Sequence, residues 1–130
     1  MRTPYQIIAD HYAASDRRDP AAMMADLAPT IEWTEMAGFP CAGTYCSADE
    51  IVRNVFARLG SEWNGYTFTL DALHDAGDTV LGTGWYAGTH KLTGKSFRCR
   101  VAHVWRVEAA RITRFEQFTD TLLVARAMEP

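Results

Sequence analysis

The residues of this chain best suited to chemistry lie on predicted strands and not in one clustered motif. His103 alternates with Val101 and Trp105 on one face of the run 99–107, whose opposite face carries arginines. Because a strand that exposes arginines on one side buries its other side, the imidazole at position 103 is expected to turn away from water. Such a ring is either a core histidine bonded to the backbone or the polar point of a pocket, where it could act as a general acid or base.

A second titratable candidate, Glu35, shares the face of Trp33 in the alternating run 30–36. If that face is buried, the pKa of Glu35 rises and the residue becomes a base suited to neutral pH; if Glu35 lies past the sheet edge, it is an ordinary solvated acid. Asp120 stands between two threonines, but the residues that follow it favour a helix N-cap. The four histidines are scattered without a clustered carboxylate, so we expect no metal and no cofactor.

Two groups of elements must position these side chains, a helical front and a strand-rich back. The pattern predicts helices over 4–14, 20–27 and, after a capping box at 47–50, up to Gly60, with a loop over 38–46. It predicts strands over 30–36, 66–73, 79–89, 95–107 and 111–119, joined by short turns, and a short helix after Asp120. This order predicts a single α+β domain over residues 1–130. A cone-shaped, curved antiparallel sheet would wrap around three N-terminal helices and leave a pocket in the cone.

The composition narrows the class of partners. The 130 residues carry a net charge of −3, which provides no electrostatic footprint for nucleic acid. No apolar run approaches the roughly 20 residues that a membrane span needs, and Asp10 and His11 interrupt what would be a signal-peptide core. The three cysteines show no zinc-type spacing; Cys41 and Cys46 are close enough in sequence for a disulfide, but reduced thiols are the simpler interpretation. We therefore expect a cytoplasmic protein that binds neither nucleic acid nor membrane.

Several weak motifs occur in a recognisable order along the chain. They are Asp-x-x-Asp-Pro-Ala over 16–21, the run 27–33, a loop with Gly43 before the capped helix, and Val-Trp-Arg-Val over 104–107 followed by 111–112. In this order the whole chain resembles the nuclear transport factor 2-like superfamily, and within it the ketosteroid isomerase and SnoaL-type polyketide cyclase branch. The resemblance implies the cone-shaped fold. It leaves the function open, because that superfamily hosts isomerases, cyclases, dehydratases, epoxide hydrolases and binders without activity.

The resemblance implies site positions that this chain fills with other residues. The tyrosine, base aspartate and second oxyanion residue of the ketosteroid isomerases match His11, Trp33 and His103, and Tyr12 is next to the first of these. The acid–base aspartate of the cyclases matches Gln117, whose amide can orient a ligand but is not a base at neutral pH. We therefore do not expect the ketosteroid isomerase reaction itself.

The pocket is expected to admit a small, largely apolar molecule. One hypothesis is proton transfer on a carbonyl-containing ring compound (isomerisation, cyclisation or dehydration), with His103 as general acid or base and Glu35 as a second group. The sequence does not decide whether His11 or Tyr12 faces the pocket. The expected ligand-binding residues are His11, Tyr12 and Gln117, which would orient a ligand oxygen, and Trp33, Trp105 and Phe115, which would form the walls.

Two other hypotheses compete with catalysis. The protein could be a binding module without chemistry, because the known bases of the branch are absent, or a structural dimer whose cone is filled by its own tryptophans. The resemblance also implies a homodimer formed sheet to sheet. Val104, Phe118 and Ile112 are the expected contact core of that dimer.

Overall fold

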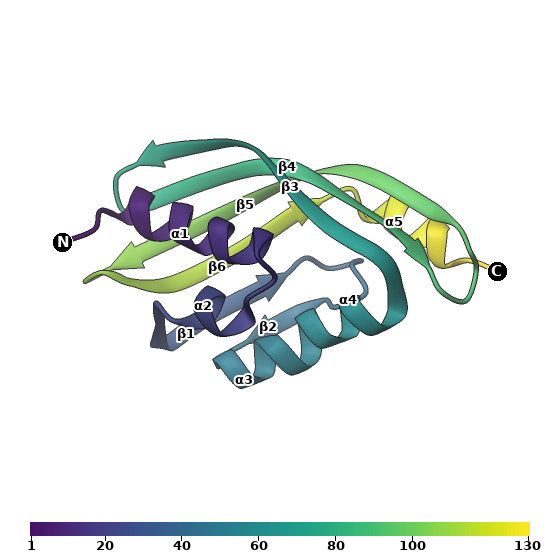
Figure 1. The fold of residues 1–130 in the computed structure, drawn as a ribbon, viewed down its shortest axis with the longest axis horizontal. Helices are drawn as coiled ribbons and strands as arrows, with labels where there is room; N and C mark the ends of the chain where they lie inside the picture. The colour runs from purple at the N-terminus through teal and green to yellow at the C-terminus, as the bar shows by residue number, and fades with distance from the viewer.

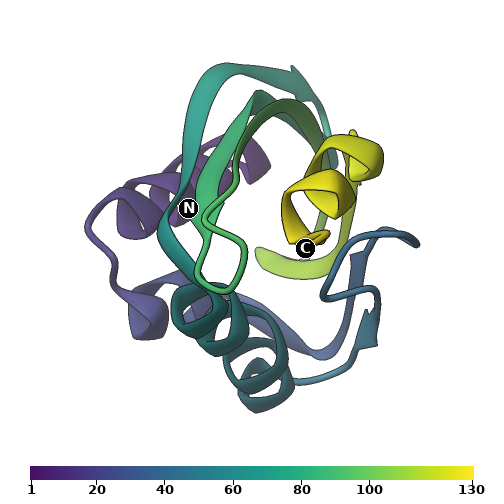
Figure 2. The same cartoon turned by 90° about the vertical axis from the view of Figure 1, so that its right-hand side faces the viewer.

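The computed structural model describes all 130 residues and shows one strongly curved sheet with helices packed against it (Figure 1). The six strands lie in the order β2-β1-β6-β5-β4-β3. They are β1 (Leu27–Glu35), β2 (Gly43–Tyr45), β3 (Trp63–Ala76), β4 (Thr79–His90), β5 (Ser96–Glu108) and β6 (Arg111–Thr119). Figure 2 shows the sheet curling around without closing. The predicted α+β fold with a curved sheet is confirmed, although β1 and β6 run parallel while all other neighbours are antiparallel.

Most of the helices begin at a side-chain N-cap. They are α1 (Pro4–Asp16), α2 (Pro20–Met24), α3 (Ala48–Ile51), the π-helical turn η1 (Val52–Phe56), α4 (Ala57–Glu62) and α5 (Thr121–Met128). Thr3, Asp19 and Ser47 each accept a hydrogen bond from a backbone N–H of the first turn that follows. No helix combines the length and the apolar composition that crossing a bilayer requires.

Several boundaries differ from the predictions, among them those of β3, which spans Trp63–Ala76 and not 66–73. The second helix ends at Met24 and not at 27, because Leu27 already pairs with Ile112 as the start of β1. The third helix does not end at Gly60, which keeps a helical backbone; the chain leaves the helix at Trp63, where φ and ψ become extended. The predicted loop over 38–46 contains the short strand β2, which pairs with the end of β1.

The sheet and helices bury two apolar clusters. The first surrounds Trp105, which is completely buried, and includes Ile8 and Tyr12 of α1. The second surrounds Tyr86 at the other end of the sheet. Phe56 and Phe68 are half-buried and pack against both clusters. Aromatic rings therefore lie where the two clusters meet.

The turn between β5 and β6 changes the register of the two strands. Arg106 pairs with Arg114 but Val107 pairs with Ile112, so a bulge lies between them. Since one extra residue turns the following side chains to the other face, Ile112 points into the core and is completely buried. The expectation that Ile112 contributes to an outer contact surface is therefore wrong, whereas Phe118 is 45% exposed.

We expect Asp120→Ala to reduce the free energy of unfolding by about 1 kcal/mol. The Oδ1 atom of Asp120 accepts a hydrogen bond from the Leu123 N–H at 3.2 Å and so caps α5, as the sequence predicts. Urea unfolding of the variant checks this, with Asp78→Ala as the control, because Asp78 is exposed and its carboxylate makes no ion pair or hydrogen bond. An unchanged transition together with lost ligand binding would contradict the capping role.

Candidate functional site

A pocket of about 590 Å³ opens between the helices and the inner face of the sheet. Residues of α1, α2, η1 and α4 line one side, and residues of every strand except β2 line the other. Nine aromatic side chains line the pocket: Tyr12, Trp33, Phe56, Trp63, Tyr66, Phe68, Tyr86, Trp105 and Phe115. A volume of this size with aromatic walls suits a small flat molecule. The open volume does not agree with the hypothesis that the cone is filled by the protein's own tryptophans.

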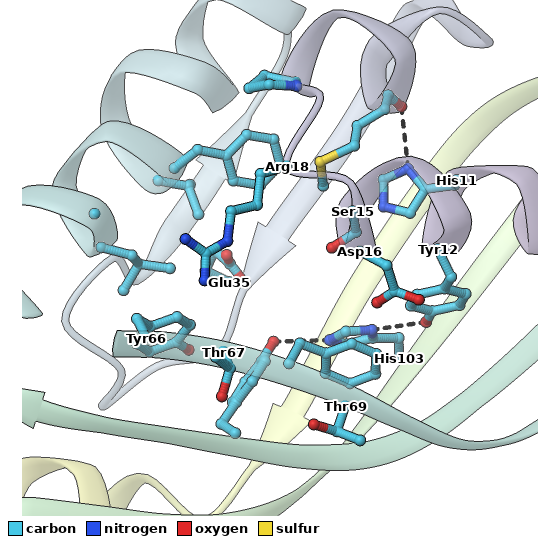
Figure 3. Close-up of a pocket in the computed structure, with 18 of the residues that line it drawn as sticks. His11, Tyr12, Ser15, Asp16, Arg18, Glu35, Tyr66, Thr67, Thr69 and His103 are labelled. Carbon is cyan, nitrogen blue, oxygen red and sulfur yellow. Dashed lines mark hydrogen bonds between the residues drawn. The ribbon is translucent and has the colours of Figure 1, made fainter. Parts of the chain in front are cut away.

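His103 lies at the floor of the pocket between two tyrosines (Figure 3). Its Nδ1 atom is 2.8 Å from the Tyr12 hydroxyl oxygen, and its Nε2 atom is 2.7 Å from the Tyr86 hydroxyl oxygen. Burial lowers the pKa of His103 to about 3, and the nearby His11 adds a smaller effect in the same direction. The imidazole is therefore neutral at physiological pH and carries one N–H, so it donates to one tyrosine and accepts from the other. We call these three residues the tyrosine–histidine relay.

A second donor reaches each tyrosine of the relay. The Trp105 indole N–H donates to the Tyr12 hydroxyl at 2.9 Å, and the Gln117 side-chain N–H donates to the Tyr86 hydroxyl at 3.0 Å. The tyrosine that accepts the hydrogen bond from the imidazole N–H therefore accepts two hydrogen bonds. Its own O–H does not bond to His103. In either tautomer of His103, one phenolic proton remains available to the pocket.

Gln117 lies behind the pocket wall and is not among the residues that line the pocket. It is 2% exposed, and its Oε1 atom accepts a hydrogen bond from the Met36 N–H at 3.1 Å. That bond directs the side-chain amide nitrogen toward Tyr86. Gln117 therefore reaches the site only through Tyr86.

Glu35 is the buried acidic group of the pocket. The sequence left open whether it is buried or solvated, and the structure shows it 4% exposed. Burial raises the pKa of Glu35 from 4.5 to about 8. The indole N–H of Trp33 is close enough to oppose this shift, although the two groups do not reach hydrogen-bond geometry. A carboxyl group whose pKa lies near neutrality can both take up and release a proton.

Unpartnered polar atoms are concentrated at the pocket. Four buried side-chain nitrogen or oxygen atoms form no hydrogen bond within the protein. Three of them, Trp33 Nε1, Glu35 Oε2 and the Tyr66 hydroxyl, belong to residues that line the pocket, and the fourth, His90 Nδ1, does not. Because buried polar groups are normally hydrogen-bonded, these atoms are free to bond to water or to another molecule in the pocket.

Both residues of the His11 and Tyr12 pair line the pocket. His11 donates through Nδ1–H to the Met23 carbonyl oxygen at 3.0 Å, which leaves Nε2 without a proton. Burial lowers the pKa of His11 to about 4, so this ring is also neutral at physiological pH. No three histidine, cysteine or acidic side chains come together in a group that could hold a metal ion.

The predicted wall residues meet in the pocket. The rings of Trp33 and Phe115 stack with centroids 4.0 Å apart, and Trp105 lies 4.6 Å from Phe115. Of the eight residues expected at the site, the structure places His11, Tyr12, Trp33, Glu35, His103, Trp105 and Phe115 around the pocket and Gln117 behind it.

Sequence reasoning missed the residues that β3 and β4 contribute, above all Tyr66 and Tyr86. A signal was present in β4, where alternate residues toward the inner face include Gly82, Gly84 and Gly88. A Cβ atom at position 82 would overlap the Tyr12 hydroxyl. A strand face made of glycines indicates space for rings from other elements, and this pattern pointed to the pocket.

Comparison with known proteins agrees with this architecture. A SnoaL-like domain matches residues 8–115. Among curated proteins, no sequence matches this chain. A crystal structure of an NTF2-like protein from Burkholderia thailandensis is similar along 100% of both chains, with 82% identity and a TM-score of 0.99.

More distant structures share the fold. An NTF2-like protein of unknown function from Burkholderia pseudomallei is 26% identical over 100% of both chains, with a TM-score of 0.88. TerC, co-crystallised with polyporic acid, is 22% identical over 98% of this chain and 100% of its own, with a TM-score of 0.84. From the domain match over most of its length, the chain belongs to the SnoaL-like family and has the NTF2-like fold.

Proposed function

We propose that this protein binds a small, flat, largely apolar carbonyl compound in the pocket and moves a proton on it, in an isomerisation, cyclisation or dehydration. The observation that carries the proposal is Glu35, a buried carboxyl group with an unpartnered oxygen, in the same pocket as a tyrosine–histidine relay with a spare phenolic proton. TerC, which has this fold, is co-crystallised with polyporic acid, which supports an organic ligand for this chain as well.

The two groups would act on neighbouring atoms of the ligand. The carboxylate form of Glu35 takes a proton from the carbon next to the carbonyl group, and the electron pair of that C–H bond moves to the carbonyl oxygen as an enolate. A phenolic O–H stabilises the negative charge that develops there. The protonated Glu35 then returns the proton to another carbon, which isomerises the compound, or to a departing hydroxyl group, which dehydrates it.

Tyr86 is the donor that fits this step. When the imidazole proton of His103 is on Nε2, the Tyr86 oxygen accepts from His103 and Gln117, and its own proton points away from both. Burial first, and then the charge of the neighbouring Glu35, raise the pKa of Tyr86 well above its usual value. Tyr86 therefore stays protonated and lies near the base.

His103 takes a different role in this proposal from the one that the sequence predicted. Both of its ring nitrogens are within hydrogen-bond distance of tyrosines, so a ligand reaches neither without displacing one of them. We assign the proton transfer to Glu35 and treat His103 as a positioning residue that acts through Tyr86. The same occupied nitrogens favour the second candidate function, a binder of a small hydrophobic ligand without chemistry.

Deuterium exchange tests the proposal directly. The protein is incubated in D₂O with 2-tetralone, a flat bicyclic ketone with exchangeable hydrogens beside its carbonyl, and mass spectrometry follows the uptake. We expect uptake well above the protein-free rate. Ketone binding by calorimetry without exchange would support the binder instead, and no binding at millimolar ketone would contradict both functions.

We also propose that the protein is a homodimer through the outer face of the sheet. Phe118 is exposed there and lies opposite Ala102 on β5. Light scattering should give twice the 14.6 kDa chain mass, and Phe118→Asp should shift the mass to that of one chain, because it places a charge in an apolar contact. Leu92→Asp, at an exposed turn off this face, is the control. A single-chain mass for the unmodified protein at micromolar concentration would refute the dimer.

A further inference from the structure

Arg18 stands at the mouth of the pocket without a partner. It lies in the turn between α1 and α2 and lines the pocket, and its exposed guanidinium takes part in no ion pair or hydrogen bond. Figure 3 shows this guanidinium extending over the side of the pocket that holds Glu35 and Tyr66, while Asp16 lies on the side of Tyr12. Arg18 is the one arginine or lysine among the residues that line the pocket.

The backbone at Arg18 has a conformation that normally belongs to glycine. Its φ angle is +56°, in the left-handed region. The Arg18 N–H donates to the Ser15 carbonyl and the Asp19 N–H donates to the Ala14 carbonyl, both at 3.0 Å. These two bonds form the Schellman motif, in which glycine is the usual residue because a Cβ atom is unfavourable there. An arginine at this position therefore costs stability that a glycine would not.

The position of Arg18 is fixed from both sides. The last turn of α1 precedes it, and Asp19 follows as the N-cap of α2, accepting from the Ala22 N–H at 3.1 Å before Pro20 opens that helix. The guanidinium is thus attached to a rigid part of the backbone at the edge of the pocket. Strained residues held in this way are concentrated at functional sites.

Two groups that line the same pocket as Arg18 complement an anion. Tyr66 and Trp33 line the same pocket, and the buried Tyr66 hydroxyl and Trp33 N–H have no partner in the protein. Trp33 is 3% exposed. Both groups are hydrogen-bond donors, and a guanidinium binds the two oxygens of a carboxylate with parallel N–H bonds. Asp16 and Glu35 are the acidic groups that line the pocket. Asp16 lies on the other side of the mouth, and Glu35, whose pKa burial raises to about 8, carries no charge below that pH.

We propose that Arg18 recognises a carboxylate on the ligand, with help from the donors of Tyr66 and Trp33, so that the pocket takes a flat ring compound that bears an acid group at the mouth. This rests on the proposed pocket ligand but not on the proton transfer. The acid group would remain at the entrance, and the apolar ring would lie between the aromatic walls.

A pair of matched probes tests the proposal. 2-Naphthoate and 2-acetylnaphthalene share the naphthalene ring, but the first carries a carboxylate where the second carries a neutral ketone. By calorimetry, we expect the protein to bind 2-naphthoate at least tenfold more tightly than the ketone. Arg18→Gln should weaken 2-naphthoate binding by tenfold or more and leave the affinity for 2-acetylnaphthalene unchanged. Arg17→Gln is the matched control, because it removes the same charge from the adjacent residue, which does not line the pocket.

A glycine variant separates recognition from folding. Arg18→Gly should melt at a higher temperature than the unmodified protein, because glycine suits the left-handed backbone, yet bind 2-naphthoate as weakly as Arg18→Gln. The proposal would be overturned if the unmodified protein bound both probes equally well, or if 2-naphthoate failed to bind at millimolar concentration. It would also be overturned if Arg17→Gln lost as much affinity for 2-naphthoate as Arg18→Gln. Deuterium exchange into 2-tetralone without a preference for 2-naphthoate would overturn this inference alone. A preference for 2-naphthoate without exchange would overturn the catalytic proposal alone.

Discussion

Replacing Glu35 with glutamine is expected to slow deuterium exchange into 2-tetralone by about 10²- to 10⁴-fold, the usual contribution of a positioned base. Glutamine keeps nearly the same shape but cannot take a proton, so the ketone should bind with little change. The measurement is the initial rate of deuterium uptake at saturating ketone. Glu32→Gln is the control, because Glu32 is exposed on the same strand and does not line the pocket.

The pH dependence of the exchange identifies the base further. Burial raises the pKa of Glu35 to about 8, and only the carboxylate form accepts a proton. The rate should therefore increase with pH, reach half of its maximum near pH 8 and become constant only at higher pH. The pKa of His103 is lowered to about 3 by burial, so we expect no step near the ordinary histidine value of 6.5. A rate that is already constant at pH 5 would contradict Glu35 as the base.

The same shift gives a control for the folding of the Glu35 variant. The pKa of Glu35 is higher in the folded protein than in the unfolded chain, so the folded state binds more protons between pH 4.5 and about 8. The stability that comes from the protonated form is present at low pH and is lost as pH rises through this window. Glu35→Gln removes this loss of stability at high pH, because glutamine does not ionise. The variant should therefore unfold at higher urea than the unmodified protein at pH 9, which excludes misfolding as the reason for a slow rate.

The position of His103 could be predicted because its strand is long and regular. Period-two alternation over 99–107 places Val101, His103 and Trp105 on one face, and all three are buried. The bond partners of His103 were not predictable in the same way. Tyr12 comes from a helix at the start of the chain and Tyr86 from the neighbouring strand, and the alternation within 99–107 indicates neither partner.

The burial of Glu35 depended on an element that the sequence did not reveal. Glu35 is the last residue of β1, so from the sequence it could lie either in the sheet or beyond its edge. In the structure it pairs with Gly43 of β2, and the preceding Thr34 pairs with Glu116 of β6. Pairing on both sides keeps this end of β1 within the sheet. Because the three residues of β2 are too few to show alternation, the pattern could not predict them.

Tyr86→Phe is expected to slow exchange into 2-tetralone by about 10²- to 10³-fold, the cost of removing one donor to a developing oxyanion. The ketone should bind with similar affinity, because the ring remains in the wall and only the hydroxyl is lost. The substitution leaves the Gln117 N–H without its acceptor, which reduces stability by about 1–3 kcal/mol. Exchange rate, ketone affinity and thermal melting are therefore measured together on the same preparation.

Tyr12→Phe separates the two ends of the relay. It removes the hydroxyl on the Nδ1 side of His103, away from the hydroxyl assigned as donor, so the fall in rate should be about tenfold at most. Nitrogen-15 NMR of His103 gives an independent measurement, since a ligand that accepts from Tyr86 requires the imidazole proton on Nε2. Bound ketone should therefore shift His103 to the Nε2–H tautomer in the unmodified protein. A larger loss in Tyr12→Phe than in Tyr86→Phe, together with the Nδ1–H tautomer, would transfer the donor role to Tyr12 and contradict the assignment of Tyr86.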